Sequence, residues 1–208
     1  YQGDDDTFTV EYTTDGQSLN IVYSGSTKGW IPIEDDTVTE VPVVLNSEGI
    51  FGYGDGPSSL TNLVSNVGVV ATDVTGVGTA RKDLAGCEYG TDKGIFGFGF
   101  VGPVTGVTNL VSNAGVVATD VSAVGTARRA VAACSYGGDK GIFGFGNDGS
   151  VTAVTNLVSN AGVVATDVTG VGTARENLAA CEYGTDTAIF GFGNTGSVTA
   201  VTNLVSNA

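Results

Sequence analysis

The chain has 208 residues, with 8 Lys and Arg against 22 Asp and Glu, no His and no Met, and a formal net charge of −14. This excess of negative charge excludes binding to nucleic acid backbones, which depends on Lys and Arg neutralising phosphates. Without His, the chain cannot form a Ser-His-Asp or Cys-His nucleophile or a His-ligated zinc site. No stretch approaches the roughly 20 apolar residues of a membrane-spanning helix. We therefore expect no nucleic acid partner, no membrane insertion, and no metal or other cofactor.

Residues 1–45 do not share the repeat that follows, and their pattern predicts a small β-module. Apolar residues alternate in two runs, 8–12 and 19–23, on either side of Asp15-Gly16, which is the pattern of a β-hairpin. Residues 28–32 are expected to add a third short strand that ends at its proline. A module of this size buries little surface by itself. It is therefore expected to serve as an anchor or an oligomerisation module.

Residues 46–208 are organised by a repeat of 47 residues. The segment TNLVSNxGVVATDVxxVGTAR begins three times at this spacing, and a single cysteine follows each copy, at Cys87, Cys134 and Cys181. A period of this length is typical of propellers, solenoids and arrays. The region holds about three and a half units and stops at Ala208 before the last strand of its final unit. We expect further chain or a neighbouring subunit to complete that unit.

Each unit is predicted to contain four short strands. In the third unit they are expected at 130–136, 141–146, 154–159 and 162–168, because runs rich in Val, Ile, Phe and Thr alternate there with Gly, Asn and Asp. Gly is too frequent for helices, at 33 residues of 208. Four short strands per unit form the blade of a β-propeller. The fold class is therefore all-β and propeller-like, with a trimeric β-stacked fibre as the alternative architecture.

Two charged positions recur with the repeat and are candidates for holding its units together. An Arg ends each GTAR segment and an Asp lies eight positions before it, which gives the pairs Asp73 and Arg81, Asp120 and Arg128, and Asp167 and Arg175. The planar guanidinium suits a partly buried bond to a carboxylate. We expect structural pairs that lock each unit to the next, with the gripping of an acidic sugar by Arg as the alternative.

The aromatic residues and the cysteines also recur with the repeat. Phe residues alternate with Gly in each GFG segment, so successive rings are predicted to share one face and to pack between units. The cysteines are expected to be small buried hydrophobic residues, with a reactive thiol as the alternative. Aromatic side chains at strand ends beside Gly are the candidates for contact with a glycan, namely Tyr89, Tyr136 and Tyr183.

No residue is nominated for catalysis. Glycoside hydrolysis requires two carboxylates about 5–9.5 Å apart. No acidic residue breaks the repeat in a way that would mark such a pair. We therefore expect a protein that is not an enzyme.

The segment TARRAVAACSYGGDKGIFGFGNDGSVTAVTNLVSN resembles a kelch-type blade. It has an Arg before the first strand, a strand of small residues, and a strand that ends in a Phe-Gly-x-Gly turn. The resemblance covers residues 45–208. The chain departs from the kelch pattern in having FGFG in place of the Gly-Gly pair and in lacking the Trp of the fourth strand.

The repeat GIFGFG…TNLVSN…GTAR also resembles propeller-like repeats in the tail and capsid fibres of tailed bacteriophages, and DGQSLNIVYSGSTKGWIPI resembles their small β-modules. This resemblance implies a virion protein, a fibre or appendage that forms a homotrimer, contacts other virion proteins and attaches to a glycan of the host surface. The alternatives are an adhesion or filament protein of a bacterial cell surface and a tailspike that degrades polysaccharide.

Overall fold

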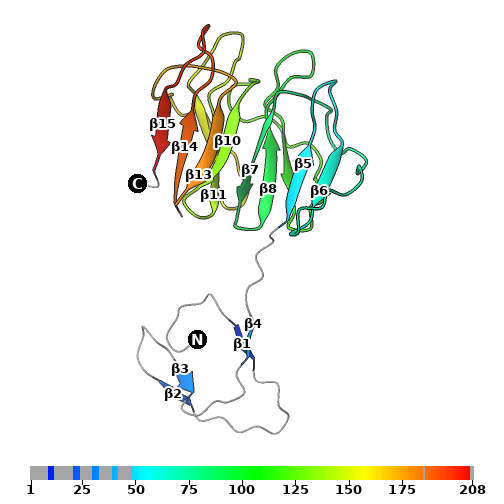
Figure 1. Ribbon diagram of the computed structural model, residues 1–208, viewed down its shortest axis with the longest axis vertical. Helices are drawn as coiled ribbons and strands as arrows, with labels where there is room; N and C mark the ends of the chain where they lie inside the picture. The colour runs from blue at the N-terminus through cyan, green and yellow to red at the C-terminus, as the bar shows by residue number, and fades with distance from the viewer. Residues whose placement is uncertain are drawn as a thin grey trace. The chain divides into compact units, whose positions relative to one another are not determined.

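The computed structural model describes residues 9–11, 21–23, 30–32, 39–41, 48–184 and 186–206. All the secondary structure in these residues is β-strand, as the sequence predicts. The chain divides into two compact parts, Tyr1–Leu45 and Asn46–Ala208. Figure 1 shows the strands of the second part arranged as successive small sheets.

The described residues of the first part form two pairs of short antiparallel strands. Strand β1 (Thr9–Glu11) pairs with β4 (Thr39–Val41), and β2 (Ile21–Tyr23) pairs with β3 (Trp30–Pro32). The predicted hairpin between the first two runs is therefore wrong, although the third strand lies where it was expected. The connection from β2 to β3 is shorter than the one from β1 to β2, and a shorter loop costs less entropy to close. The Asp15-Gly16 segment itself lies outside the described residues.

The second part contains four antiparallel sheets, which we call blades one to four. Blade one has two strands, and the other three blades have three strands each, in the order of the chain. The strands are β5 (Gly49–Gly52) and β6 (Thr61–Val64); β7 (Ala85–Tyr89), β8 (Lys93–Gly97) and β9 (Thr108–Val111); β10 (Ala132–Tyr136), β11 (Lys140–Gly144) and β12 (Thr155–Val158); and β13 (Ala179–Tyr183), β14 (Thr187–Gly191) and β15 (Thr202–Val205).

The fourth predicted strand of each unit is reduced to isolated bridges. In blade three, the segment predicted as 162–168 touches β12 at two points, where Val164 pairs with Val158 and Val168 pairs with Thr155. Gly162, at a φ of 76°, opens this segment in a tight turn. The segment is therefore an outer edge that follows β12 without forming a continuous ladder.

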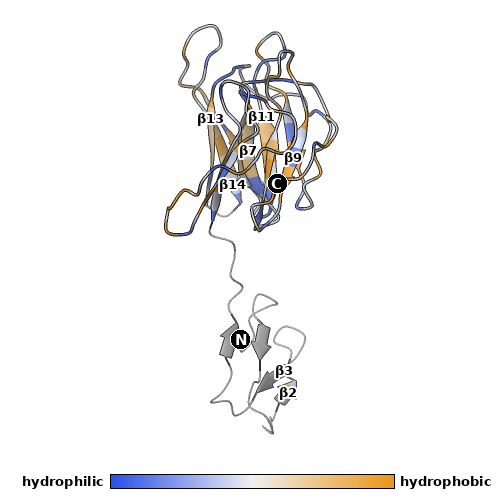
Figure 2. Cartoon of the chain, turned by 90° about the vertical axis from the view of Figure 1, so that its right-hand side faces the viewer, coloured by the Kyte–Doolittle hydropathy of each residue, from blue (hydrophilic) through white to orange (hydrophobic). Residues whose placement is uncertain are grey.

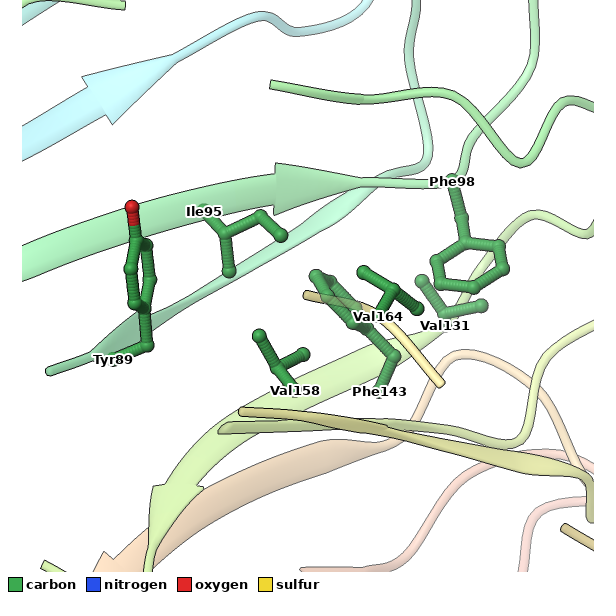
Figure 3. Packing of buried hydrophobic residues seen from close by; sticks show 7 residues of the cluster. All are labelled: Tyr89, Ile95, Phe98, Val131, Phe143, Val158 and Val164. Carbon is green, nitrogen blue, oxygen red and sulfur yellow. The ribbon is translucent and has the colours of Figure 1, made fainter. Parts of the chain in front are cut away.

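Successive blades pack face to face through their apolar side chains. The first strands of neighbouring blades lie side by side, β7 against β10 and β10 against β13. Figure 3 shows one of these interfaces, where Ile95 and Phe98 of blade two meet Phe143 and Val158 of blade three. Apolar stretches accordingly run along strands such as β11 and β13 in Figure 2. The arrangement is β-propeller-like.

In blades two and three, the two phenylalanines of the FGFG segment point to opposite neighbours. Phe96 packs on Tyr53 of blade one, with ring centroids 5.3 Å apart, whereas Phe98 packs on Phe143 of blade three at 5.1 Å. The prediction that these rings share one face is wrong, because Phe98 follows the end of β8 with a φ of 65°. A left-handed backbone at this point turns the second ring to the other side. The prediction that the rings pack between units is confirmed.

Candidate functional site

The recurring arginines lie in a closed hydrogen-bond network, which is described here for blade three. Arg128 is fully buried and donates from Nη2 to Oδ1 of Asn156 at 2.6 Å and from Nη1 to the carbonyl of Thr126 at 3.0 Å. Asn156 in turn donates to Asp167 at 2.9 Å. Asp167 accepts from the backbone N–H of Thr126 at 3.0 Å and from its hydroxyl at 2.6 Å. Arg128, Asn156, Asp167 and Thr126 therefore form a closed ring of hydrogen bonds. The ring joins the segment before the first strand of the blade to the outer edge of the blade.

Each of these arginines also links its blade to the one before. The Arg128 guanidinium carbon lies 4.2 Å from the centre of the Phe98 ring in blade two, while its Nε donates to the carbonyl of Phe145 at 2.8 Å. Phe145 has a φ of 63°, a conformation that costs free energy for an aromatic residue. The hydrogen bond from Arg128 helps to hold that strained residue while the cation–π contact joins two blades.

The same network recurs in the neighbouring blades. Arg81 stacks on Tyr53 at 4.3 Å, and Arg175 stacks on Phe145 at 4.1 Å and donates to Asn203 at 2.8 Å. Nη2 of Arg81 and Oδ1 of Asn109 have no hydrogen-bond partner among the described residues. These two atoms correspond to the Arg128–Asn156 pair one repeat later, but no hydrogen bond joins them.

The predicted aspartate–arginine pairs are wrong in two respects. No ion pair joins them among the described residues, because Asp120 and Asp167 accept hydrogen bonds from Asn and Thr, and Asp73 accepts one from Asn62. The Asp whose charge acts on Arg81 is Asp120, and the one that acts on Arg128 is Asp167, each a repeat further along the chain than the predicted partner. Sequence spacing favoured the Asp eight positions before the Arg, whereas folding returns the chain to the Arg after one full blade. The Asp and the Arg both have structural roles, but each has partners other than the predicted ones.

From the sequence, the recurring Asn of each TNLV strand is predicted only as a structural turn or ladder cap, and the Thr that completes the network is not nominated. The signal for the Asn was its recurrence at the second position of every TNLV strand, at Asn62, Asn109, Asn156 and Asn203. Asn109 and Asn156 are fully buried, and a buried amide must find hydrogen-bond partners. The Gly of each VGTAR segment is part of the same site. Gly125, at a φ of 78°, lies so close to Asn156 and Asp167 that a Cβ would overlap both side chains.

Charge within the network follows from its burial and its hydrogen bonds. Burial lowers the pKa of Arg128 to about 10, so the guanidinium stays charged at neutral pH. Burial acts to raise the pKa of Asp167, but the hydrogen bonds from Thr126 and Asn156 and the charge of Arg128 outweigh it. The pKa of Asp167 therefore lies below its usual value of 3.8. Asp120 behaves in the same way with Thr79, Asn109 and Arg81.

The three tyrosines predicted to contact a glycan do not share one environment. Tyr89 and Tyr136 are buried between blades, and the ring of Tyr89 lies against the position that a Cβ of Gly162 would occupy. Their prediction as glycan platforms is wrong, because the next blade covers each ring. Tyr183 alone is exposed.

The three cysteines also differ in burial. All three are free thiols, and Cys134 is buried, Cys87 is half-buried and Cys181 is exposed. Burial raises the pKa of both Cys87 and Cys134 to about 12, so these two thiols are protonated at neutral pH. A protonated thiol is a poor nucleophile. The prediction of a small buried hydrophobic residue is therefore correct for Cys134 and wrong for Cys181.

The repeat also presents exposed valines at equivalent places in three blades: Val74, Val121 and Val168 are 47%, 43% and 45% exposed, and a second set is more exposed. Val69, Val116 and Val163 are 63%, 64% and 65% exposed. Two hydrogen bonds join each valine to the serine four positions earlier. The serine N–H donates to the valine carbonyl, and the serine hydroxyl accepts from the valine N–H. For Val116 and Ser112 these bonds measure 3.0 and 3.2 Å. The chain therefore carries a row of three identically held valines, which we call the valine row.

Comparison with known proteins supports the fold. No known family model matches the chain, and no curated protein matches it. Among solved structures, the chain resembles that of YjhT with a TM-score of 0.54 and 12% sequence identity; the match covers 71% of this chain and 48% of YjhT. The chain thus spans about half the length of YjhT. At this identity the likeness shows the fold alone. No helix among the described residues is long and apolar enough to cross a membrane.

Proposed function

We propose that this chain is a non-enzymatic structural and adhesive component of a bacteriophage virion, a fibre or other appendage protein that acts as a homotrimer. It would bind other virion proteins and copies of itself and present its repeats to the surface of the host cell. The sequence resemblance to phage fibre repeats supports this role. The buried networks support it too, because they make each blade a stiff support for the loops that it carries.

The valine row is the observation that carries the adhesive part of the proposal. Val69, Val116 and Val163 each keep more than 60% of their surface exposed, and we take the repetition of this exposure in three blades as the mark of an interaction surface. Here the same side chain is exposed in three blades and held by the same two hydrogen bonds. Repetition turns one weak contact into several, and linked weak contacts multiply in affinity. The contact surface therefore moves from the predicted tyrosines to the valine row, with the apolar faces of surface sugars as its partner.

Binding to bacterial cells tests the adhesive role. Fluorescently labelled chain would be mixed with a panel of bacterial strains and compared with a variant that carries Val69→Thr, Val116→Thr and Val163→Thr. Threonine keeps the shape of valine but has a hydroxyl in place of one methyl group. At these exposed positions the fold is expected to be unchanged. We expect cell binding to fall about tenfold, because three linked contacts weaken together. Val198→Thr, at another exposed valine, is the matched control.

Equal binding by the triple variant and the native chain would contradict the role of the valine row. Immunogold labelling of phage particles with an antibody to the chain tests the location, and label on bacterial envelopes alone would favour the alternative of a cell-surface protein. Release of reducing sugar from host polysaccharide would contradict the proposal that the chain is not an enzyme.

A further inference from the structure

Among the described residues, blade one has no strand that corresponds to β7, β10 and β13, the first strands of the other blades. Strands β8, β11 and β14 each pair on both edges, whereas β5 pairs with β6 alone among the described residues. Beside β5 lies a cavity of about 410 Å³ whose walls come from β5 and from β7 and β8 of blade two. Its lining includes Gly52, Asp92, Gly94 and Gly115.

The interface between blades two and three shows what fills the corresponding space. There the Sγ of Cys87 lies 2.7 Å from the position that a Cβ of Gly141 would occupy. Gly94 is the same residue one repeat earlier, and the nearest atoms to its Cβ position belong to Val111 and to the Cys87 carbonyl, at 3.5 and 3.7 Å. No thiol takes that place.

A tyrosine is lacking in the same way. The ring of Tyr89 lies 2.9 Å from the Cβ position of Gly162. At Gly115, one repeat earlier, the nearest neighbours are the side-chain atoms of Leu63, and no aromatic ring is among them. Among the described residues, blade one therefore supplies no counterparts of Cys87 and Tyr89 to the cavity, a Cys and a Tyr two positions apart.

A hydrogen bond completes the pattern. The N–H of Gly90, directly after Tyr89, donates to the carbonyl of Asp139 at 2.7 Å, and Gly137 donates to Asp186 at 3.0 Å. The residue that corresponds to these two aspartates one repeat earlier is Asp92, which lines the cavity. The cavity is thus shaped for Cys, any residue, Tyr and Gly in an extended chain.

The chain's own residues before β5 do not match this shape. When the GIFG segments are aligned, Pro42 falls at the position of Cys, Val44 at that of Tyr and Leu45 at that of Gly. Residues Thr39–Val41 just before them form β4, which pairs with β1. Proline also lacks the N–H that a strand in a sheet can donate.

We propose that the groove beside β5 binds an extended polypeptide segment with the sequence of the repeat's own first strand, Ala-x-Cys-x-Tyr-Gly. The segment adds to the open edge of β5 as an antiparallel strand, the mode of recognition in which backbone hydrogen bonds supply affinity and side-chain pockets supply specificity. The pockets are those over Gly94 for Cys and over Gly115 for Tyr. Strand β7 at the interface of blades two and three and strand β10 at the interface of blades three and four show the same strand already bound in this way within the chain.

A synthetic peptide tests the groove in the full chain. The probe is fluorescein-labelled Leu-Ala-Ala-Cys-Glu-Tyr-Gly-Thr, the sequence of residues 178–185, used in reducing buffer and followed by fluorescence anisotropy. We expect saturable binding. The same peptide with Pro in place of Cys and Val in place of Tyr is expected to bind about tenfold more weakly.

Substitution of the pocket glycine supplies the matched control. Gly94→Ala is expected to weaken peptide binding with an unchanged melting temperature, because the methyl group narrows the pocket but meets atoms no closer than 3.5 Å within the chain. The loss is expected to be partial, since Ala188 occupies the same position beside Cys134 in blade four. Gly141→Ala is expected to lower the melting temperature, since its methyl group would overlap the thiol of Cys87. Val198→Ala is expected to bind the peptide as the native chain does.

Two results would overturn the proposal. Absence of saturable binding shows that the groove does not take this strand. A melting temperature that falls in Gly94→Ala as much as in Gly141→Ala shows that the chain fills the groove itself. Neither result bears on the valine row, so this proposal and the proposed function fail separately.

Discussion

Blades three and four have nearly the same sequence and very different surroundings. Phe145 in blade three is 2% exposed, whereas Phe192 at the same position in blade four is 61% exposed. Tyr136 and Tyr183 differ in the same direction, at 6% and 45%. In Figure 1, blade three lies between two neighbours and blade four has one. Burial at these positions therefore depends on the next blade, because neither face of a single sheet is covered by its own strands.

This comparison indicates that the stability of each blade depends on its interfaces with neighbouring blades. In a repeat array, each unit contributes its own stability and a term for each contact with a neighbour. Blade three makes both contacts and blade four makes one. Substitutions at equivalent positions in the two blades should therefore differ in cost although the residues are the same.

Loss of a buried arginine is expected to have the largest effect. Arg128→Ala leaves the Phe145 carbonyl, the Thr126 carbonyl and Asn156 without their donor and removes the stack on Phe98. We expect the free energy of unfolding to fall by about 3–5 kcal/mol. Arg175→Ala should cost less, because the Nε of Arg175 has no hydrogen-bond partner among the described residues and its bond to the Phe190 carbonyl is long, at 3.4 Å. Urea unfolding followed by circular dichroism measures both, and equal costs would contradict the comparison.

The second-largest effect is expected from truncation of the second phenylalanine of the FGFG segment. Phe145→Ala removes a ring packed against Phe190 and should lower the free energy of unfolding by about 3–4 kcal/mol. Phe192→Ala removes an exposed ring and should cost less than about 1 kcal/mol. Thermal unfolding of the two variants provides the measurement. If the cost of Phe192→Ala approached that of Phe145→Ala, another blade would have to cover blade four in solution.

The smallest expected effect concerns the aspartates of the outer edge. Asp120→Asn weakens the bonds from Thr79 and should cost about 1 kcal/mol, because the site is exposed enough for solvent to screen it. Asp73 accepts a bond from Asn62, and no Thr of a preceding segment donates to it among the described residues. Asp73→Asn should therefore cost less, and denaturant unfolding at neutral pH compares the two.

The same aspartates predict how stability changes in acid. The pKa values of Asp120 and Asp167 lie below the usual 3.8 in the folded chain, so the unfolded chain binds protons first as the pH falls. Their contribution is present above about pH 4 and is lost as the pH falls through their lower folded pKa values. The difference in stability between the native chain and Asp120→Asn should shrink below pH 4. A difference that stayed constant to pH 2 would contradict the assigned pKa shift.

Much of the fold could be predicted because it repeats. The 47-residue period, the all-β class and the first three strands of each unit follow from local alternation and turn residues, which act within a few positions of the chain. Errors arose where a residue depends on distant partners. Asp120 was assigned to Arg128 by proximity in sequence, and the fourth strand was assigned from its composition although Gly162 and the network of Asp167 interrupt it.

The sequence by itself determined the period, the strands and the residues that recur, because backbone propensity and turn chemistry are local. Only the tertiary structure decided which face each residue occupies and which partner it meets. The positive φ of Phe98 sends its ring to the next blade, and the presence or absence of that blade makes Tyr136 buried and Tyr183 exposed. Burial is a property of two surfaces that meet, and a single repeat specifies one of them.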